Sequence, residues 1–306
     1  MDIFTSLVIP ALVGIGIGIL SGMLGIGGGT VLVPIFRLAF GMSPIMSTAT
    51  SLFTIIPTSV SGAVSHIRHK TCVPSLGLAA GLGGACTSPI GVWLATISPA
   101  WMVMLAAALI IGYSAVNMLR KAWKMKPARA GAAVPAAPAG EPPVEAAVEQ
   151  AGDAAANDDA APEVPAGESA VAADTGKAFP KLTRKQLAIG AAIGLGAGLA
   201  SGYVGVGGGF IMVPLMLSLV GISMKQASGT SLIAVMLLAI PGTIEQGLLG
   251  NIDYMAGIAV AVGSIPGAVI GARLVRLVPE RTLRFIFGGF LIVAAVVLVL
   301  NEVGVL

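Results

Sequence analysis

The sequence SGMLGIGGG at residues 21–29 returns as SGYVGVGGG at residues 201–209, and a Val-Pro pair follows shortly after each copy. The same register continues without a gap to the shared prolines Pro99 and Pro279. Matched pairs along the way include Thr50 with Thr230, Ser51 with Ser231, Gly62 with Gly242 and Gly91 with Gly271. The chain is therefore a duplicated unit.

Composition places both copies in a membrane. Hydrophobic residues make up 56% of the 306 residues and charged residues only 10%, and the mean hydropathy is +0.95. So few charges cannot cover the surface of a water-soluble protein of this size. Apolar stretches near or above the roughly 20 residues of a membrane-spanning helix occupy residues 3–24, 45–64, 73–97, 101–119, 187–206, 227–244, 255–270 and 285–300. We expect an all-α polytopic membrane protein.

A segment of different composition separates the two copies. Residues 127–180 are mainly Ala, Pro, Gly, Glu and Asp, and they hold nine of the 14 acidic residues. Such a segment has too little apolar surface to offset the entropy lost on ordering. The predicted domains are a first membrane repeat at 1–126, a disordered cytoplasmic linker at 127–180 and a second membrane repeat at 181–306. A solvated spacer is favoured over a regulatory role for the linker.

The distribution of basic residues predicts the topology, because Lys and Arg near the ends of a span favour the cytoplasmic side. Basic residues flank the linker at 120–126 and 181–185. Residues 66–70 are also basic, whereas the equivalent loop carries Glu245 and Asp253 and no base. The next loop of each copy reverses this bias. Equivalent loops should therefore face opposite sides of the membrane, which is the arrangement of two inverted-topology repeats.

Short apolar runs follow the triple glycines, at residues 30–40 and 210–220. At 1.5 Å per residue these runs are too short to cross the hydrocarbon alone. Each repeat is therefore predicted to be a glycine-broken helix hairpin plus three transmembrane helices. The tips of the broken helices should reach the midplane, where non-helical backbone has to be buried in protein or line a wet cavity.

The helix breaks predict a site for a small anion. Bare glycine amides lie next to new helix N-termini, where the macrodipole is positive. Glycine runs can instead allow close packing between helices. We assign this packing role to the runs GIGIG at 14–18 and GLGAG at 194–198. Three consecutive glycines instead stop a helix. The predicted substrate-binding residues at the breaks are Gly27, Gly28, Gly29, Thr30, Gly207, Gly208, Gly209 and Phe210.

Few polar side chains lie within the spans, and most of them recur in both copies. Thr50, Ser51, Thr230 and Ser231 can face the breaks and donate hydroxyl groups to an oxyanion, although such hydroxyls also often bond their own backbone. His66 and Gln246 occupy equivalent positions. We expect both to snorkel at a membrane boundary, with coupling or gating as the alternative. Arg37 has no basic counterpart and is a weaker candidate for a vestibule cation.

Several functional classes are not supported. Neither glycine copy follows a β-strand or precedes an acidic partner, so a dinucleotide site is rejected, and no phosphate-loop motif is present. No enzyme activity, cofactor, metal site or nucleic-acid partner is predicted, and Cys72 and Cys86 are expected to be unpaired. No Asp or Glu lies deep within a span, as a cation carrier or proton pump would normally require.

The repeated motif, the Val-Pro pairs and the later Thr-Ser-Leu resemble the sulfite exporter TauE/SafE family of membrane transporters. The resemblance covers both membrane repeats and leaves out the linker. It implies movement of small sulfur-containing anions such as sulfite, sulfoacetate, thiosulfate or other organosulfonates, and related carboxylates. The matching positions are Gly25, Gly27, Gly28, Gly29, Pro34, Thr50 and Ser51, with Gly205, Gly207, Gly208, Gly209, Pro214, Thr230 and Ser231.

The combined interpretation is a secondary transporter in the plasma (inner) membrane, an exporter that binds its anion near the midplane between the repeats. An inside-negative potential expels anions, with about 2.3 kcal/mol for each charge that crosses 100 mV. The alternatives are an anion channel, a proton-coupled carboxylate carrier of the same fold that uses His66, or a scaffold without transport. The predicted partners are the anion and the lipid bilayer. The oligomeric state is left open, and a homodimer is compatible with the sequence.

Overall fold

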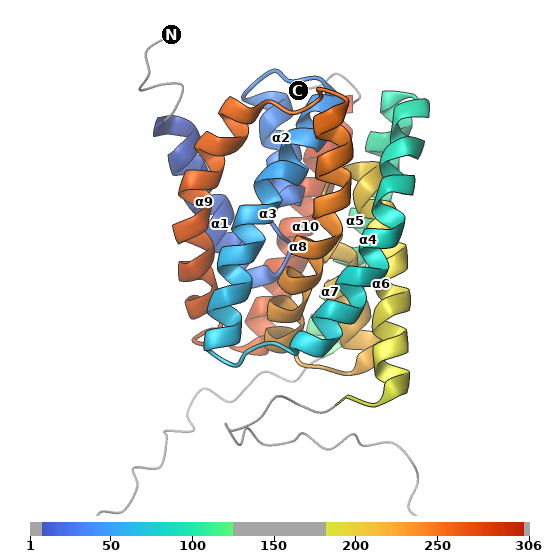
Figure 1. Cartoon of the computed structure of the whole chain (residues 1–306). Helices are drawn as coiled ribbons and strands as arrows, with labels where there is room; N and C mark the ends of the chain where they lie inside the picture. The colour runs from blue at the N-terminus through green and yellow to red at the C-terminus, as the bar shows by residue number, and fades with distance from the viewer. Residues whose placement is uncertain (1–7, 125–181, 303–306) are drawn as a thin grey trace, which may run out of the picture. The chain divides into compact units, whose positions relative to one another are not determined.

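A computed structural model describes residues 8–124 and 182–302, and the predicted linker lies outside these residues (Figure 1). Every element in the described ranges is a helix, as expected. The elements are α1 (Ile9–Leu24), α2 (Gly29–Leu38), α3 (Pro44–Arg68), α4 (Pro74–Ile97), α5 (Ala100–Lys124), α6 (Arg184–Val204), α7 (Gly209–Leu215) with the π-helical η2 (Met216–Val220), α8 (Met224–Leu248), α9 (Tyr254–Leu274) and α10 (Glu280–Glu302).

The two copies have the same order of elements. Helices α1 to α5 correspond to α6, α7 with η2, α8, α9 and α10, and a short helix follows the glycine break in each copy. By length and composition, five of the described helices can cross a membrane, namely α4, α5, α6, α8 and α9. The chain is therefore an all-α polytopic membrane protein.

Helices of one copy pack mainly on helices of the other. Helix α1 packs along α9, its counterpart α6 packs along α4, and the equivalent pairs α3–α8 and α5–α10 also pack together. Both copies consequently form one compact unit. In Figure 1 the α3–α4 loop and its counterpart, the α8–α9 loop, lie at opposite ends of this unit.

Close approach of backbones explains the strongest of these pairings. A β-carbon on Gly18 of α1 would collide with the Ser264 carbonyl oxygen of α9, and one on Gly198 of α6 would collide with the Gly84 carbonyl oxygen of α4. A β-carbon on Gly16 or Gly196, in contrast, would have no such neighbour within 4 Å. The packing assignment of the two glycine runs is therefore right for their ends and wrong for their middle residues.

We predict that Gly198→Ala destabilises the protein by about 1–3 kcal/mol, because a methyl group overpacks the α4–α6 contact. Gly196→Ala is the matched control on the same helix, and it should leave stability unchanged or slightly higher because alanine favours helix. Thermal unfolding in detergent measures both effects. Equal unfolding temperatures for the two variants would contradict the close-approach argument.

Basic side chains from several loops meet at one end of the unit. Arg276 Nη1 lies 3.0 Å from His69 Nδ1, which joins the α9–α10 loop to the α3–α4 loop. Lys225 Nζ donates to the Arg276 carbonyl oxygen at 3.0 Å, which adds the start of α8. Because basic groups favour the cytoplasmic side, this basic end is predicted to be the cytoplasmic one.

The inverted topology can be tested with single cysteines at Ser98 and Val278, which occupy equivalent loops. In a background without Cys72 and Cys86, the two cysteines should react with an impermeant thiol reagent from opposite sides of the membrane. The Val278 position should label from the cytoplasmic side. Labelling of both cysteines from the same side would rule out the inverted arrangement.

Candidate functional site

Each glycine motif breaks the helix by a left-handed turn. Gly28 has φ = 89° and Gly208 has φ = 65°, and each serves as the N-cap of the short helix that follows. A side chain at either position would be strained, because L-residues rarely adopt positive φ. The predicted helix breaks are confirmed, and the new helices begin at Gly29 and Gly209.

The two breaks pack against each other. A β-carbon on Gly209 would lie 2.5 Å from the Gly25 carbonyl oxygen, and one on Gly29 would collide with the Val206 carbonyl oxygen. The fully buried side chains of Ile55 and Val235, which are equivalent in the repeat, lie against both breaks. The structure is therefore closed at the meeting point of the breaks.

Unused hydrogen-bond donors surround this closed core. In the described part of the chain, the amides of Gly27, Gly28, Gly207 and Gly208 donate to no backbone carbonyl. Several buried hydroxyl groups also have no hydrogen-bond partner, namely those of Ser21, Thr30, Ser51, Ser59 and Ser201. Buried polar groups are usually paired, so this concentration of open donors requires an explanation.

Ser21 and Ser201 were missed as candidates, although each opens the repeated motif. A β-carbon on Gly28 would lie 3.7 Å from Ser21 Cβ, and one on Gly208 would lie 3.4 Å from Ser201 Cβ. Each serine therefore lies beside the N-cap glycine of its own break. The sequence does contain a pattern that could have identified them, because Ser21 and Ser201 occupy the same position in the two copies of the motif.

The other residues predicted at the breaks are buried in different surroundings. Thr30 has a buried hydroxyl and also borders a groove of about 260 Å³ between α2 and α10. Phe210 takes the equivalent place in the second copy and is part of the apolar core. The two breaks are therefore similar in backbone and different in this side chain.

The predicted threonines bind the other copy of the repeat. The Asp253 amide donates to Thr50 Oγ1 at 3.0 Å, and the Val73 amide donates to Thr230 Oγ1 at 2.9 Å. Asp253 and Val73 are the N-cap residues of α9 and α4. Each threonine thus holds the start of a helix in the opposite copy and keeps its own proton for another acceptor.

The two predicted serines differ from each other. Ser231 Oγ donates to the Gly25 carbonyl oxygen at 2.7 Å, which ties α8 to the first break. Ser51 Oγ is buried without a partner. An anion contact for any of these four side chains remains a prediction.

We predict that Thr50→Val and Thr230→Val each lower the free energy of unfolding by roughly 1–3 kcal/mol, because a buried amide loses its acceptor while the shape is kept. Thermal unfolding with and without an anion separates this effect from ligand binding. The double variant should show nearly the sum of the two losses, since the sites lie in different contacts. Unchanged stability in both single variants would contradict a helix-capping role.

His66 does not snorkel, because it is fully buried. Its Nε2 lies 2.8 Å from the Gly22 carbonyl oxygen and its Nδ1 lies 2.7 Å from Thr71 Oγ1. A carbonyl oxygen only accepts, so Nε2 carries a proton. His66 thereby ties the end of α3 to the last turn of α1, just before the first break.

Gln246 is also buried, and its Oε1 accepts from Asn251 Nδ2 at 2.7 Å. The snorkelling expectation is therefore wrong for Gln246 too. Arg37 lies in the last turn of α2 and is only partly buried. The coupling and gating hypotheses for these residues remain predictions.

A cavity of about 40 Å³ lies at the end of the unit opposite to the basic end. It reaches Thr48, whose side chain packs against Gly205 of the second break. This cavity leads from one end of the unit toward the closed core. Its lining residues are Pro44, Ile45, Thr48, Ala95, Thr96, Ser98, Val103, Met104, Tyr203 and Gln246.

Cys72 and Cys86 are both free, as expected. Burial raises the pKa of the Cys72 thiol to about 11, so this side chain stays protonated at neutral pH. In the described part of the chain, no cluster of His, Cys, Asp and Glu could hold a metal ion.

The family model of the sulfite exporter TauE/SafE matches residues 10–298. The chain belongs to this family. Among similar proteins, the probable membrane transporter protein YunE of Bacillus subtilis (strain 168) is 24% identical over 91% of this chain and 92% of its own length. YdhB of the same organism, also named a probable membrane transporter protein, is 26% identical over 88% of this chain and 90% of its own. The TauE/SafE chain described here is thus a membrane transporter.

A shorter match involves the probable membrane transporter protein MamO of Magnetospirillum gryphiswaldense. It is 35% identical over 35% of this chain and covers 18% of MamO. No solved structure matches the chain.

Proposed function

We propose that this transporter exports small sulfur-containing anions, such as sulfite, sulfoacetate, thiosulfate or other organosulfonates, and binds them between the two glycine breaks. The observation that carries the proposal is the concentration of buried donors without acceptors at the breaks. They comprise the amides of Gly27, Gly28, Gly207 and Gly208 and the hydroxyls of Ser21 and Ser201.

The chemistry of these groups suits an oxyanion. A sulfite or sulfonate group presents three oxygen atoms that accept hydrogen bonds from several directions, and every proposed protein group can donate. The N-terminus of α2 adds the positive end of a helix dipole. Neutral donors avoid the strong ion pair that would slow release, because the anion is held without a buried counter-charge.

Transport would require the breaks to separate. Ile55 and Val235 fill the space between them in the closed structure, and the cavity ends beside Gly205. A rocking motion between the interwoven copies could expose the site to either side in turn, as in other repeat-built transporters. Export then follows from the inside-negative potential, which contributes about 2.3 kcal/mol per charge at 100 mV.

We predict that Ser21→Ala and Ser201→Ala each weaken anion binding by about tenfold, because each removes one hydrogen bond of roughly 1.4 kcal/mol to a charged group. Stability without the anion should not fall, since the hydroxyl groups removed have no partner. Sulfoacetate-dependent thermal shifts measure the affinity, and counterflow in proteoliposomes measures transport. Ser88→Ala is the control, because Ser88 is also buried without a partner but packs beside Gly242.

Unchanged affinity in both serine variants would place the anion elsewhere. Linear, non-saturating flux without counterflow would favour the channel alternative. The proton-coupled alternative is tested by His66→Gln, which introduces the residue that Gln246 already provides in the other copy. Potential-driven export predicts that this variant still transports and responds to voltage rather than to a pH gradient.

A further inference from the structure

The two ends of the molecule differ at equivalent positions. The cavity residues Pro44, Ala95 and Met104 correspond in the repeat to Met224, Val275 and Arg284. Met224 and Val275 are fully buried, with no exposed side-chain surface, whereas Ala95 and Met104 of the first set border the cavity. The first set of positions therefore borders a cavity, whereas Met224 and Val275 of the second set are packed inside the protein.

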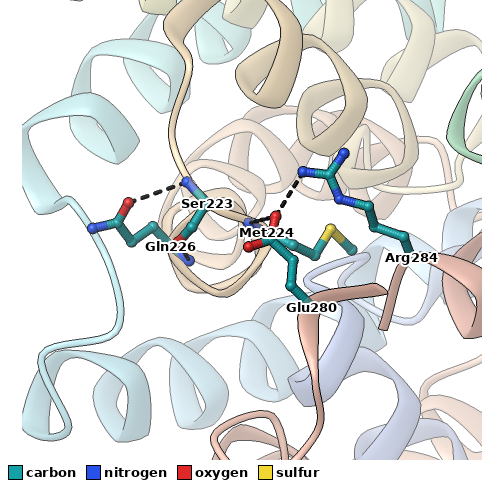
Figure 2. A network of polar contacts seen from close by, with 5 residues as sticks. All are labelled: Ser223, Met224, Gln226, Glu280 and Arg284. Carbon is teal, nitrogen blue, oxygen red and sulfur yellow. Dashed lines mark hydrogen bonds and ion pairs between the residues drawn. The ribbon is translucent and has the colours of Figure 1, made fainter. Parts of the chain in front are cut away.

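A polar network lies beside this second set of positions, at the basic end of the unit. Glu280 Oε1 accepts from Arg284 Nη2 at 2.6 Å and from the Met224 amide at 3.2 Å (Figure 2). An ordinary ion pair within one helix turn would link Glu280 to Arg284 alone. The bond to Met224 adds a second helix, so the carboxylate ties the start of α10 to the start of α8.

The start of α8 is fixed independently of this tie. Ser223 Oγ accepts from the Gln226 amide, and Gln226 Oε1 accepts from the Ser223 amide, which forms a capping box (Figure 2). Glu280 is therefore not needed to begin the helix. Its bond to Met224 holds α10 against α8.

One hydrogen-bond donor of Arg284 has no acceptor. Its Nε is buried and has no partner, because Glu280 contacts the guanidinium through one oxygen and one terminal nitrogen. The side chains are only 15% and 30% exposed for Arg284 and Glu280, so water does not fully screen the pair. A sulfonate or sulfite could engage Nε and Nη2 with two oxygens, which is the stronger geometry for arginine.

We infer that Arg284 is the entry residue for the anion at the predicted cytoplasmic end, and that Glu280 is a tethered carboxylate which occupies Arg284 and keeps this entrance closed. An arriving oxyanion displaces Glu280 from Arg284, and the α10–α8 tie opens. The inference rests on the proposed function for the identity of the anion. The closing role of Glu280 rests on the network alone.

The test uses a cysteine in place of Val275, in full-length protein that lacks Cys72 and Cys86. Its reaction rate with N-ethylmaleimide reports opening, and this reagent is uncharged and does not compete for Arg284. In the parent the rate should be slow and should rise several-fold with sulfoacetate. Glu280→Gln should raise the rate about tenfold without any anion, because the charge attraction to Arg284 is lost.

Arg284→Gln should also label fast, but sulfoacetate should no longer change its rate, and transport of sulfoacetate should fall at least tenfold. Arg281→Gln is the matched control, because Arg281 is on the same helix and also has a buried Nε without a partner, but it lies over the Phe285 ring and outside the Glu280 network. This variant should behave as the parent does. Slow labelling of Glu280→Gln, with the cysteine reactive after unfolding, would overturn the closing role. A parent-like sulfoacetate response in Arg284→Gln would overturn the entry role.

The two proposals fail in different ways. If sulfoacetate affects no variant and is not transported, the proposed substrate class is wrong, while the Glu280→Gln rate still decides the closing role. If sulfoacetate is transported but Glu280→Gln stays closed, the function stands and the inference about Glu280 falls.

Discussion

Contact between helix backbones is the constraint on which the rest of this structure depends. In a membrane there is little hydrophobic gain from bringing helices together, so close packing and hydrogen bonds have to hold them. Glycines at a four-residue spacing remove the side chains between α1 and α9 and between α4 and α6. That close approach brings the two helix breaks together in the core.

The breaks are possible only because this packing encloses them. Amides that leave helical geometry cannot be exposed to lipid, and the opposite copy of the repeat covers them here. The same interwoven arrangement supplies Thr50 and Thr230 as acceptors for amides of the other copy. The hydroxyl groups of Thr50 and Thr230 therefore have hydrogen-bond partners, whereas the hydroxyl groups of Ser21 and Ser201 beside the breaks have none.

Much of this architecture could be predicted from the sequence, because the evidence was local. Three adjacent glycines disfavour a continuous helix, and glycine readily adopts the left-handed backbone found at Gly28 and Gly208. Contacts between residues distant in sequence were not predictable in the same way. Nothing near Thr50 indicates that its partner is the Asp253 amide, and His66 was placed at a boundary because its burial depends on α1.

Helix geometry explains why Gly16 lies outside the contact between α1 and α9. Residues two positions apart point in nearly opposite directions at 3.6 residues per turn, so Gly16 could not share a contact face with Gly14 and Gly18. The four-residue spacing of Gly14, Gly18 and Gly22 was the informative pattern. All three would collide with α9 if they carried a β-carbon.

Because helices of one copy pack on helices of the other, the order in which the chain is synthesised affects when this packing can form. Helix α1 is made first, but the helix that covers its glycine face, α9, is among the last to leave the ribosome. Helix α4 likewise cannot pack until α6 has been made, and the Val73 amide has no Thr230 acceptor until α8 has been made. The first copy therefore cannot reach its final packing by itself, and the early helices must persist in the bilayer as an unfinished assembly until the second copy is inserted.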